Sequence, residues 1–294
     1  MTNHSIMDKA GSFLYSYARL LDRKRYEYHF EGGTKEAVIQ ALRGYQNADG
    51  GFGNALEPDI RDPHSQPVPT EMALLVMEEI DCFDPAMMEG IAGYLRTITL
   101  ENGGLPLIRS SVHGYAHTPW WSTEDDRCPS INPTGTVIGL LYKYYGDQAV
   151  VREQWFEENV RYIWSYMESN EPSGFHDGTH WIQFLQHTPD TGRAAAYWRK
   201  VDEWLGAPGV IEKDPHASGY VHKVLDWAPQ RESYAGKFVS GEDKQIHLKA
   251  LAEQQQEDGG WPISWQPPSI AAEQEWRGFV TVERLKTLKS YGVL

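Results

Sequence analysis

The sequence predicts an all-α protein built of paired helices, with little or no sheet, and three observations support this. Apolar residues recur with helical spacing through most of the chain, as in Val38–Tyr45 and Met88–Ile98. No segment shows the sustained two-residue alternation that is typical of a half-buried strand. A short glycine-rich turn returns at multiples of about 50 residues, a period that indicates stacked helix pairs.

The predicted helices have recognisable starts. A Ser, Thr, Asp or Asn side chain before a helix accepts a hydrogen bond from the first turn, and proline suits the first helical position. Four residues fit the capping role, two of them followed by proline: Thr34, Asp84, Asn132 and Ser240. Further apolar stripes at 137–145 and 156–167 extend the helical pattern beyond the first two.

Composition sets the broad class. The 294 residues are 40% hydrophobic and carry a formal charge of −14. The apolar fraction is sufficient for a core. The negative charge argues against nucleic-acid binding and against docking on anionic membranes. The first thirty residues hold no signal-peptide core, and apolar runs such as Ala73–Met77 are far too short for a membrane span. We therefore expect a cytoplasmic protein without a transmembrane segment. Cys82 and Cys128 are too few for a disulfide framework or a four-thiolate zinc site.

Three segments repeat one pattern: a helix end, a polar residue, two glycines and an apolar residue. They are Tyr45–Gly53, Leu100–Pro106 and Gln254–Pro262. The first glycine is expected to end a helix in the left-handed region, and the second allows a close backbone approach. The residues assigned to the repeat are Gln46, Gly50, Gly51, Phe52, Gly103, Gly104, Gln256, Gly259 and Gly260. Degenerate copies are expected at Ser169–Phe175 and Gly206–Val210.

These residues resemble a known family. Gln46-x-x-x-Gly50-x-Phe52 and Gln256-x-x-Gly259-x-Trp261 are similar to the Gln-Gly-Trp repeats of squalene and oxidosqualene cyclases. The same turn occurs in protein prenyltransferase β subunits and in thioester-domain toroids. The resemblance implies an α/α toroid, here one domain over 1–294 with about five to six antiparallel helix pairs. Long inserted loops are expected near 50–70 and 106–133.

Two longer stretches, 51–71 and 257–278, are also similar to a group of bacterial toroid proteins of unknown function. The departures from the known families are specific. The Asp-x-Asp-Asp acid of class II cyclases is absent, and Glu124-Asp125-Asp126 only imitates it. The zinc ligands of prenyltransferases and the thioester Cys-Gly-Glu-Gln are absent as well. The resemblance therefore supports the fold, and none of these activities carries over.

The acidic loop after the first repeat is the first candidate site. Prolines between 58 and 69 exclude a continuous helix there. Glu57 and Asp59, two apart around Pro58, are the candidate catalytic pair, able to share a proton or bind a cation. The alternative is a solvated acidic loop held by Arg61.

Aromatic residues form the second candidate feature, since the chain has 11 Trp and 16 Tyr. Aromatic faces stack on sugar rings and stabilise carbocations, although the same residues also pack between helix layers. The residues assigned to substrate binding are Trp120, Trp121, Asn132, Trp181, Trp261, Trp265 and Arg61. Glu57, Asp59, Trp121 and Trp261 are expected to border one end of a central cavity.

No cofactor and no metal is predicted. His176 and His180 are four residues apart, but Gly178 intervenes and the segment offers no clear third ligand. Neither a P-loop nor a dinucleotide-binding glycine motif occurs.

The expected partner is therefore a small molecule, and the oligomeric state is left open. Three functions remain. The resemblance favours a terpenoid cyclase-like lyase or isomerase on a small hydrophobic substrate. A carbohydrate-active hydrolase or lyase would use the carboxylate pair and the Trp platforms. A non-catalytic toroid would bind a ligand or a protein.

Overall fold

The computed structural model describes residues 3–294 and divides the chain into two compact units, which are described separately. One unit combines residues up to Ala41 with Glu203–Leu294, and the other comprises Leu42–Asp202. Between residues 3 and 294, strand is limited to one two-residue pair and isolated bridges. The all-α class predicted from the sequence is confirmed. No helix in the described range is long and apolar enough to cross a membrane.

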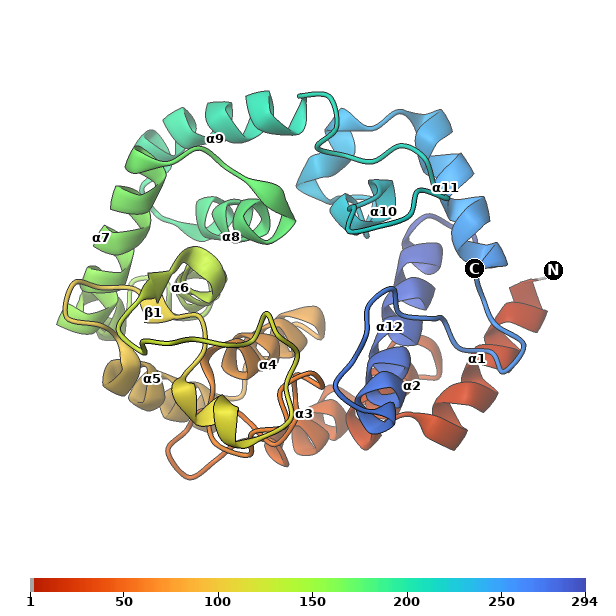
Figure 1. The fold of residues 1–294 in the computed structure, drawn as a ribbon, viewed down its shortest axis with the longest axis horizontal. Coiled ribbons are helices and arrows are strands. Elements are labelled where there is room, and N and C mark those ends of the chain that lie inside the picture. Colours follow the sequence, from red (N-terminus) through yellow and green to blue (C-terminus); the bar gives the residue numbers. More distant parts are fainter. Residues whose placement is uncertain (1–2) are drawn as a thin grey trace. The chain divides into compact units, whose positions relative to one another are not determined.

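The first unit holds the two ends of the chain (Figure 1). Its helices α1 and α2 pack against α12, and α10 and α11 pack together. Their bounds, with the short 3-10 helix η3, are α1 Asn3–Tyr17, α2 Leu20–Phe30, α10 Val224–Trp227, η3 Tyr234–Phe238, α11 Gly241–Glu253 and α12 Ile270–Ser290.

The second unit carries the candidate site. In it α6 packs against α4, α7 and α8, and the strands β1 and β2 pair in antiparallel fashion (Figure 1). Its elements are α4 Pro67–Glu79, α5 Pro85–Ile98, β1 Leu105–Pro106, η1 Ser110–Gly114, β2 Pro129–Ser130, α6 Ile131–Tyr145, η2 Ala149–Arg152, α7 Gln154–Ser169 and α8 Gly174–His187. Helices α3 Lys35–Arg43 and α9 Thr191–Leu205 cross the boundaries between the units.

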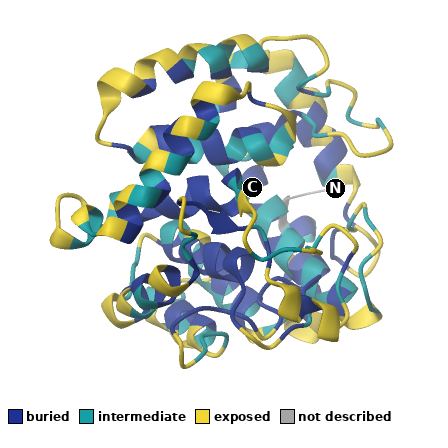
Figure 2. Cartoon of the chain, turned by 60° about the vertical axis from the view of Figure 1, so that its left-hand side comes forward, coloured by how far each residue is buried: buried dark blue, intermediate teal, exposed yellow. Residues whose placement is uncertain are grey.

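The predicted helix caps are largely present. The side chains of Thr34, Asp84 and Ser240 accept hydrogen bonds from the backbone N–H groups three residues on. Asn132 has non-helical angles (φ −90°, ψ 116°), so the regular part of α6 begins after it. Buried residues concentrate on the packed faces of the helices, whereas connecting loops hold many exposed residues (Figure 2).

The three glycine turns share one backbone geometry. In the first, Asn47 N–H donates to Gly51 O (2.9 Å) and Gly50 N–H donates to Asn47 O (3.0 Å). The same two bonds occur between Leu100, Gly103 and Gly104 and between Gln256, Gly259 and Gly260. In each turn the first glycine has a positive φ, of 90°, 79° and 95° respectively. The three segments therefore share a backbone conformation as well as a sequence pattern.

Each turn also presses its first glycine against another helix. A Cβ at Gly50 would lie 2.1 Å from a backbone carbonyl oxygen, that of Gly90 in α5. The equivalent positions are Gly103 against Glu158 O at 2.2 Å and Gly259 against Lys9 O at 2.1 Å. The expected copies at Gly174 and Gly209 keep a positive φ but have no atom within 4 Å of a built Cβ. They are turns with a positive φ that lack the close approach of the three full turns.

A threonine on the following helix completes each turn, and the sequence analysis missed it. The hydroxyl oxygen of Thr70 in α4 accepts from the Phe52 N–H at 3.0 Å. Thr134 does the same for Leu105 at 2.9 Å, and Thr281 for Trp261 at 3.1 Å. These backbone groups are buried, so the hydroxyl replaces the water they lose.

One repeat assignment needs correction. Gln46 Nε2 donates to Gly50 O (3.0 Å) and to Met87 O (3.4 Å) in α5. In the last turn the residue with this role is Gln255, which donates to Gly259 O (2.9 Å) and to Ile6 O (3.0 Å). Gln256 instead accepts from Arg277 Nη2 at 2.7 Å. The four-residue spacing to the first glycine, shared by Gln46 and Gln255, is the signal that the sequence analysis overlooked.

Candidate functional site

The acidic loop, within residues 50–70, is hydrogen-bonded to the second long loop of the same unit, residues 106–133. Arg61 N–H donates to Ala116 O (3.0 Å), and Thr118 N–H donates to Asp59 O (3.2 Å). An apolar cluster of Ile60, Val68, Ile108 and Val112 lies between the loops, with Leu107 and Trp121 packed on it. Both loops are thus folded around a small core of their own, which argues against a freely solvated acidic loop.

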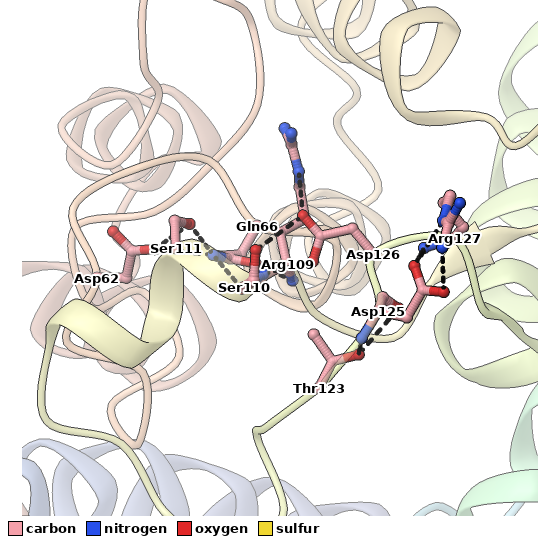
Figure 3. A network of polar contacts seen from close by, with 9 residues as sticks. All are labelled: Asp62, Gln66, Arg109, Ser110, Ser111, Thr123, Asp125, Asp126 and Arg127. Atoms are coloured by element: carbon pink, nitrogen blue, oxygen red, sulfur yellow. Dashed lines mark hydrogen bonds and ion pairs between the residues drawn. The ribbon is translucent and has the colours of Figure 1, made fainter.

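Asp62 accepts hydrogen bonds from both loops at this junction (Figure 3). Its Oδ2 accepts from Ser111 Oγ (2.6 Å) and Gln66 Nε2 (2.8 Å), and its Oδ1 accepts from the His64 N–H (3.0 Å). Burial works against the charged form, but these hydrogen bonds outweigh it and hold the Asp62 pKa below its usual value. Asp62 is therefore a structural anion that fixes the two loops.

The right-hand side of Figure 3 shows hydrogen bonds within the second loop. Asp126 accepts from the Ser110 N–H at 2.6 Å, and Asp125 accepts from Arg127 through two side-chain nitrogens at 2.9 Å each. Two carboxylates of the acidic run at 124–126 thus accept hydrogen bonds from within the same loop.

Glu57 is held differently. Its side chain is 4% exposed, and Trp121 Nε1 donates to its Oε1 at 3.1 Å. Its Oε2 is buried and has no hydrogen-bond partner between residues 3 and 294. Burial raises the pKa of Glu57 to about 8, and the charge of Asp59 adds to this, while Trp121 and two backbone N–H groups lower it. At neutral pH Glu57 is thus mainly a neutral carboxylic acid.

The structure brings some of the predicted site residues together and separates others. Asp59 is buried at 1% exposure near Glu57, and Arg61, half-buried in the same loop, donates to Pro58 O (3.4 Å). Trp121 contacts Glu57 directly, whereas its neighbour Trp120 is 49% exposed. Asn132 is half-buried at the start of α6.

The other three tryptophans that were predicted to bind substrate make the following contacts within the fold. Trp181 is fully buried in α8, edge-on to Tyr197 with ring centroids 6.2 Å apart. Trp261 is 1% exposed, and its Nε1 donates to Leu251 O of the preceding helix α11 at 2.8 Å. Trp265 lies edge-on to Trp276 at 5.2 Å. Because Trp261 is buried and belongs to the other compact unit, we leave it out of the candidate site.

A second buried acid was not singled out from the sequence. Glu71 in α4 is 7% exposed, and its Oε1 lies 3.2 Å from Nδ1 of His180 in α8. Thr136 in α6 lies 2.5 Å from the same nitrogen. Three helices are needed to bring these side chains together, so no local spacing could have revealed the group.

Other features of the chain do not join the site. A shallow pocket between α7 and α9 is lined by Glu168, Arg193, Ala196, Tyr197 and Lys200, none of them a predicted site residue. Across residues 3–294, no three His, Cys, Asp or Glu side chains gather in a way that could hold a metal ion.

Comparisons with known proteins bear on the fold. No family model matches the chain, and no curated protein matches it. Among solved structures it is similar to a protein from Actinoplanes, with a TM-score of 0.55, 15% identity and 98% of each chain covered. It is also similar to the type II terpene cyclase MstE from Scytonema, with a TM-score of 0.51 and 13% identity, over 98% of this chain and 88% of that one. This likeness is one of fold, and it agrees with the all-α toroid class expected from the sequence.

Proposed function

We propose that this chain is a proton-transferring lyase or isomerase acting on a small, largely apolar molecule, with Glu57 as the proton donor. The observation that carries the proposal is the state of the Glu57 carboxyl group. One oxygen is fixed by Trp121, and the other is buried without an acceptor for its proton. A carboxylic acid with an uncommitted proton in apolar surroundings is suited to protonate a weakly basic carbon–carbon double bond.

The surroundings of Glu57 support this chemistry. The apolar cluster beneath the loop, Ile60, Val68, Ile108 and Val112, offers no strong base that would take the proton first. The indole of Trp121 is half-buried and lies against both this cluster and Glu57. Its π face can stabilise the cation that protonation creates. The likeness in fold to a type II terpene cyclase adds support by analogy.

The test compares wild type, Glu57→Gln and a control, Glu124→Gln, which changes an exposed acid of the second loop. Each is incubated with farnesol, geranylgeraniol and their diphosphates, and the products are separated by gas chromatography and mass spectrometry. We expect conversion by wild type and Glu124→Gln and a loss of at least about a hundredfold in Glu57→Gln, the usual contribution of a general acid. Equal rates in all three, or no conversion by wild type, would reject the assignment.

A carbohydrate-active enzyme is the second candidate, because the charge of Asp59 acts on Glu57 and two carboxyl groups are the equipment of glycosidases. The same proteins are therefore also tested on a panel of nitrophenyl glycosides. Glycoside hydrolysis that depends on both Glu57 and Asp59, without conversion of the prenyl compounds, would replace the first proposal by the second. Binding of prenyl compounds without any turnover would favour the non-catalytic toroid.

A further inference from the structure

The pocket between α7 and α9 is lined by no residue of the loops around Glu57. Its volume is about 340 Å³, and both helices are labelled in Figure 1. Pockets of roughly 300–1,000 Å³ take small molecules. One lining side chain, Glu168, comes from α7. The other four occupy one face of α9, because they lie at positions i, i+3, i+4 and i+7: Arg193, Ala196, Tyr197 and Lys200.

Aromatic rings join the two helices at this pocket. Trp164 in α7 and Tyr197 in α9 are 5% and 9% exposed, and their ring centroids are 5.3 Å apart. Tyr197 and the methyl group of Ala196 both line the pocket. A molecule in the pocket therefore meets an aromatic ring and a methyl group, which favours a ligand with an apolar part.

Arg193 brings a cation whose hydrogen-bond donors are unused. Its guanidinium carbon lies 4.7 Å from the centroid of the Trp164 ring, and this stacking orients the planar group. The side chain forms no hydrogen bond and no ion pair with any residue between 3 and 294. A stacked guanidinium keeps the donors along its edge, so it can bind a carboxylate through two parallel hydrogen bonds.

Lys200, the other cation of the pocket, is already engaged. Its Nζ donates to Met167 O (3.4 Å), Asn170 O (3.2 Å) and Glu171 Oε1 (2.7 Å). An ammonium group has three protons, so these acceptors use all of its donors. Of the two cations that line the pocket, Arg193 is therefore the one available to a ligand.

Glu168 brings an anion to the same pocket. It is exposed, and within the described part of the chain its carboxylate has no hydrogen bond and no ion pair. It does not pair with Arg193, although both side chains line the pocket. A ligand with a single charge would meet a like charge on one of these side chains. A ligand that carries both charges can pair with each of them.

We propose that this pocket binds an α-amino acid with an apolar side chain. The carboxylate of the amino acid pairs with the guanidinium of Arg193, and its ammonium group pairs with the carboxylate of Glu168. Its side chain lies against Tyr197 and Ala196. Both unpaired charges of the pocket are then satisfied by one small molecule. This inference goes beyond the function proposed for Glu57 and does not depend on it.

The first test measures which charges the ligand needs. L-Phenylalanine and L-leucine are titrated into the wild-type protein by isothermal calorimetry, together with 3-phenylpropionate, which lacks the ammonium group, and phenethylamine, which lacks the carboxylate. We expect one site for each amino acid, and binding of the two analogues that is at least about tenfold weaker than that of phenylalanine, because each loses a charge-assisted pair. No binding of either amino acid at millimolar concentration would reject the proposal. Equal affinity for phenylalanine and either analogue would also reject it.

The second test assigns the two charges to their side chains. Arg193→Gln and Glu168→Gln change exposed residues, so both variants should fold as wild type does. Each should weaken phenylalanine binding about tenfold or more. Relative to phenylalanine, Glu168→Gln should bind 3-phenylpropionate better than wild type does, and Arg193→Gln should bind phenethylamine better.

The control is Arg199→Gln, which removes an exposed charge of α9 that does not line the pocket. It should bind phenylalanine as wild type does, and the melting temperatures of all variants are compared to verify folding. An equal loss in Arg199→Gln would attribute the effect to net charge and overturn the site. Unchanged phenylalanine binding in Arg193→Gln or in Glu168→Gln would overturn it as well.

Discussion

The neutral state of Glu57 makes a prediction about stability that requires no substrate. Replacing Glu57 by Gln keeps the size of the side chain and its acceptor for Trp121 Nε1, but it removes the ability to ionise. At low pH the variant should match wild type, because Gln resembles the protonated acid. At higher pH wild type must either ionise a buried group or hold a proton that the unfolded chain has released.

The magnitude follows from the pKa of Glu57, which burial raises from 4.5 to about 8. The folded chain then binds more protons than the unfolded chain between these two values, so stability falls as pH rises through this range. Each pKa unit corresponds to about 1.36 kcal/mol, so the loss reaches about 3 kcal/mol at pH 7 and about 5 kcal/mol above pH 8. This is an upper limit, because water that enters beside the carboxylate reduces its cost.

The assay is reversible urea unfolding of both proteins between pH 4 and pH 9. Glu71 and His180 also titrate, but they are present in both proteins and cancel in the difference. The expected result is a difference in unfolding free energy that is close to zero near pH 4.5 and grows in favour of Glu57→Gln up to about pH 8. Glu124→Gln, at an exposed position, should show no such trend. Parallel curves for wild type and Glu57→Gln would show that Glu57 is not a buried neutral acid.

Three further predictions concern the scaffold. Gly259→Ala should lower the free energy of unfolding by about 3–5 kcal/mol, because its Cβ would lie 2.1 Å from Lys9 O at a positive φ. Gly209→Ala, also at a positive φ but with no atom within 4 Å of the new Cβ, should lower it by only about 1–2 kcal/mol. Equal losses in urea unfolding would contradict the close-approach argument. Thr281→Val should cost about 1–3 kcal/mol by leaving the buried Trp261 N–H without an acceptor, and Thr281→Ser should retain most of the stability; a neutral Thr281→Val would remove this hydroxyl from the repeat. The single domain expected from the sequence predicts one cooperative transition seen alike by circular dichroism and by tryptophan fluorescence; two separated transitions would instead divide the chain at its two compact units.

The features that could be predicted from the sequence are those whose causes are local. The caps at Thr34, Asp84 and Ser240 each depend on a side chain and a backbone N–H three residues apart. The glycine turns require a positive φ that glycine tolerates and most residues do not, so their positions can be recognised in the sequence. Helical spacing of apolar residues predicted the all-α class for the same reason.

Tertiary structure decided what depends on residues far apart in the chain. Gln255 rather than Gln256 ties the last turn because it reaches Ile6 O, 249 residues away. Glu57 and Asp59 could be singled out by their spacing, but the neutral state of Glu57 depends on burial in a folded loop and on Trp121, 64 residues away. Three different helices bring Glu71, Thr136 and His180 together. In the sequence, His180 could be paired only with His176, four residues away, as a possible metal ligand. Burial and hydrogen bonding set the protonation of these groups, and both are properties of the packed chain rather than of any segment of it.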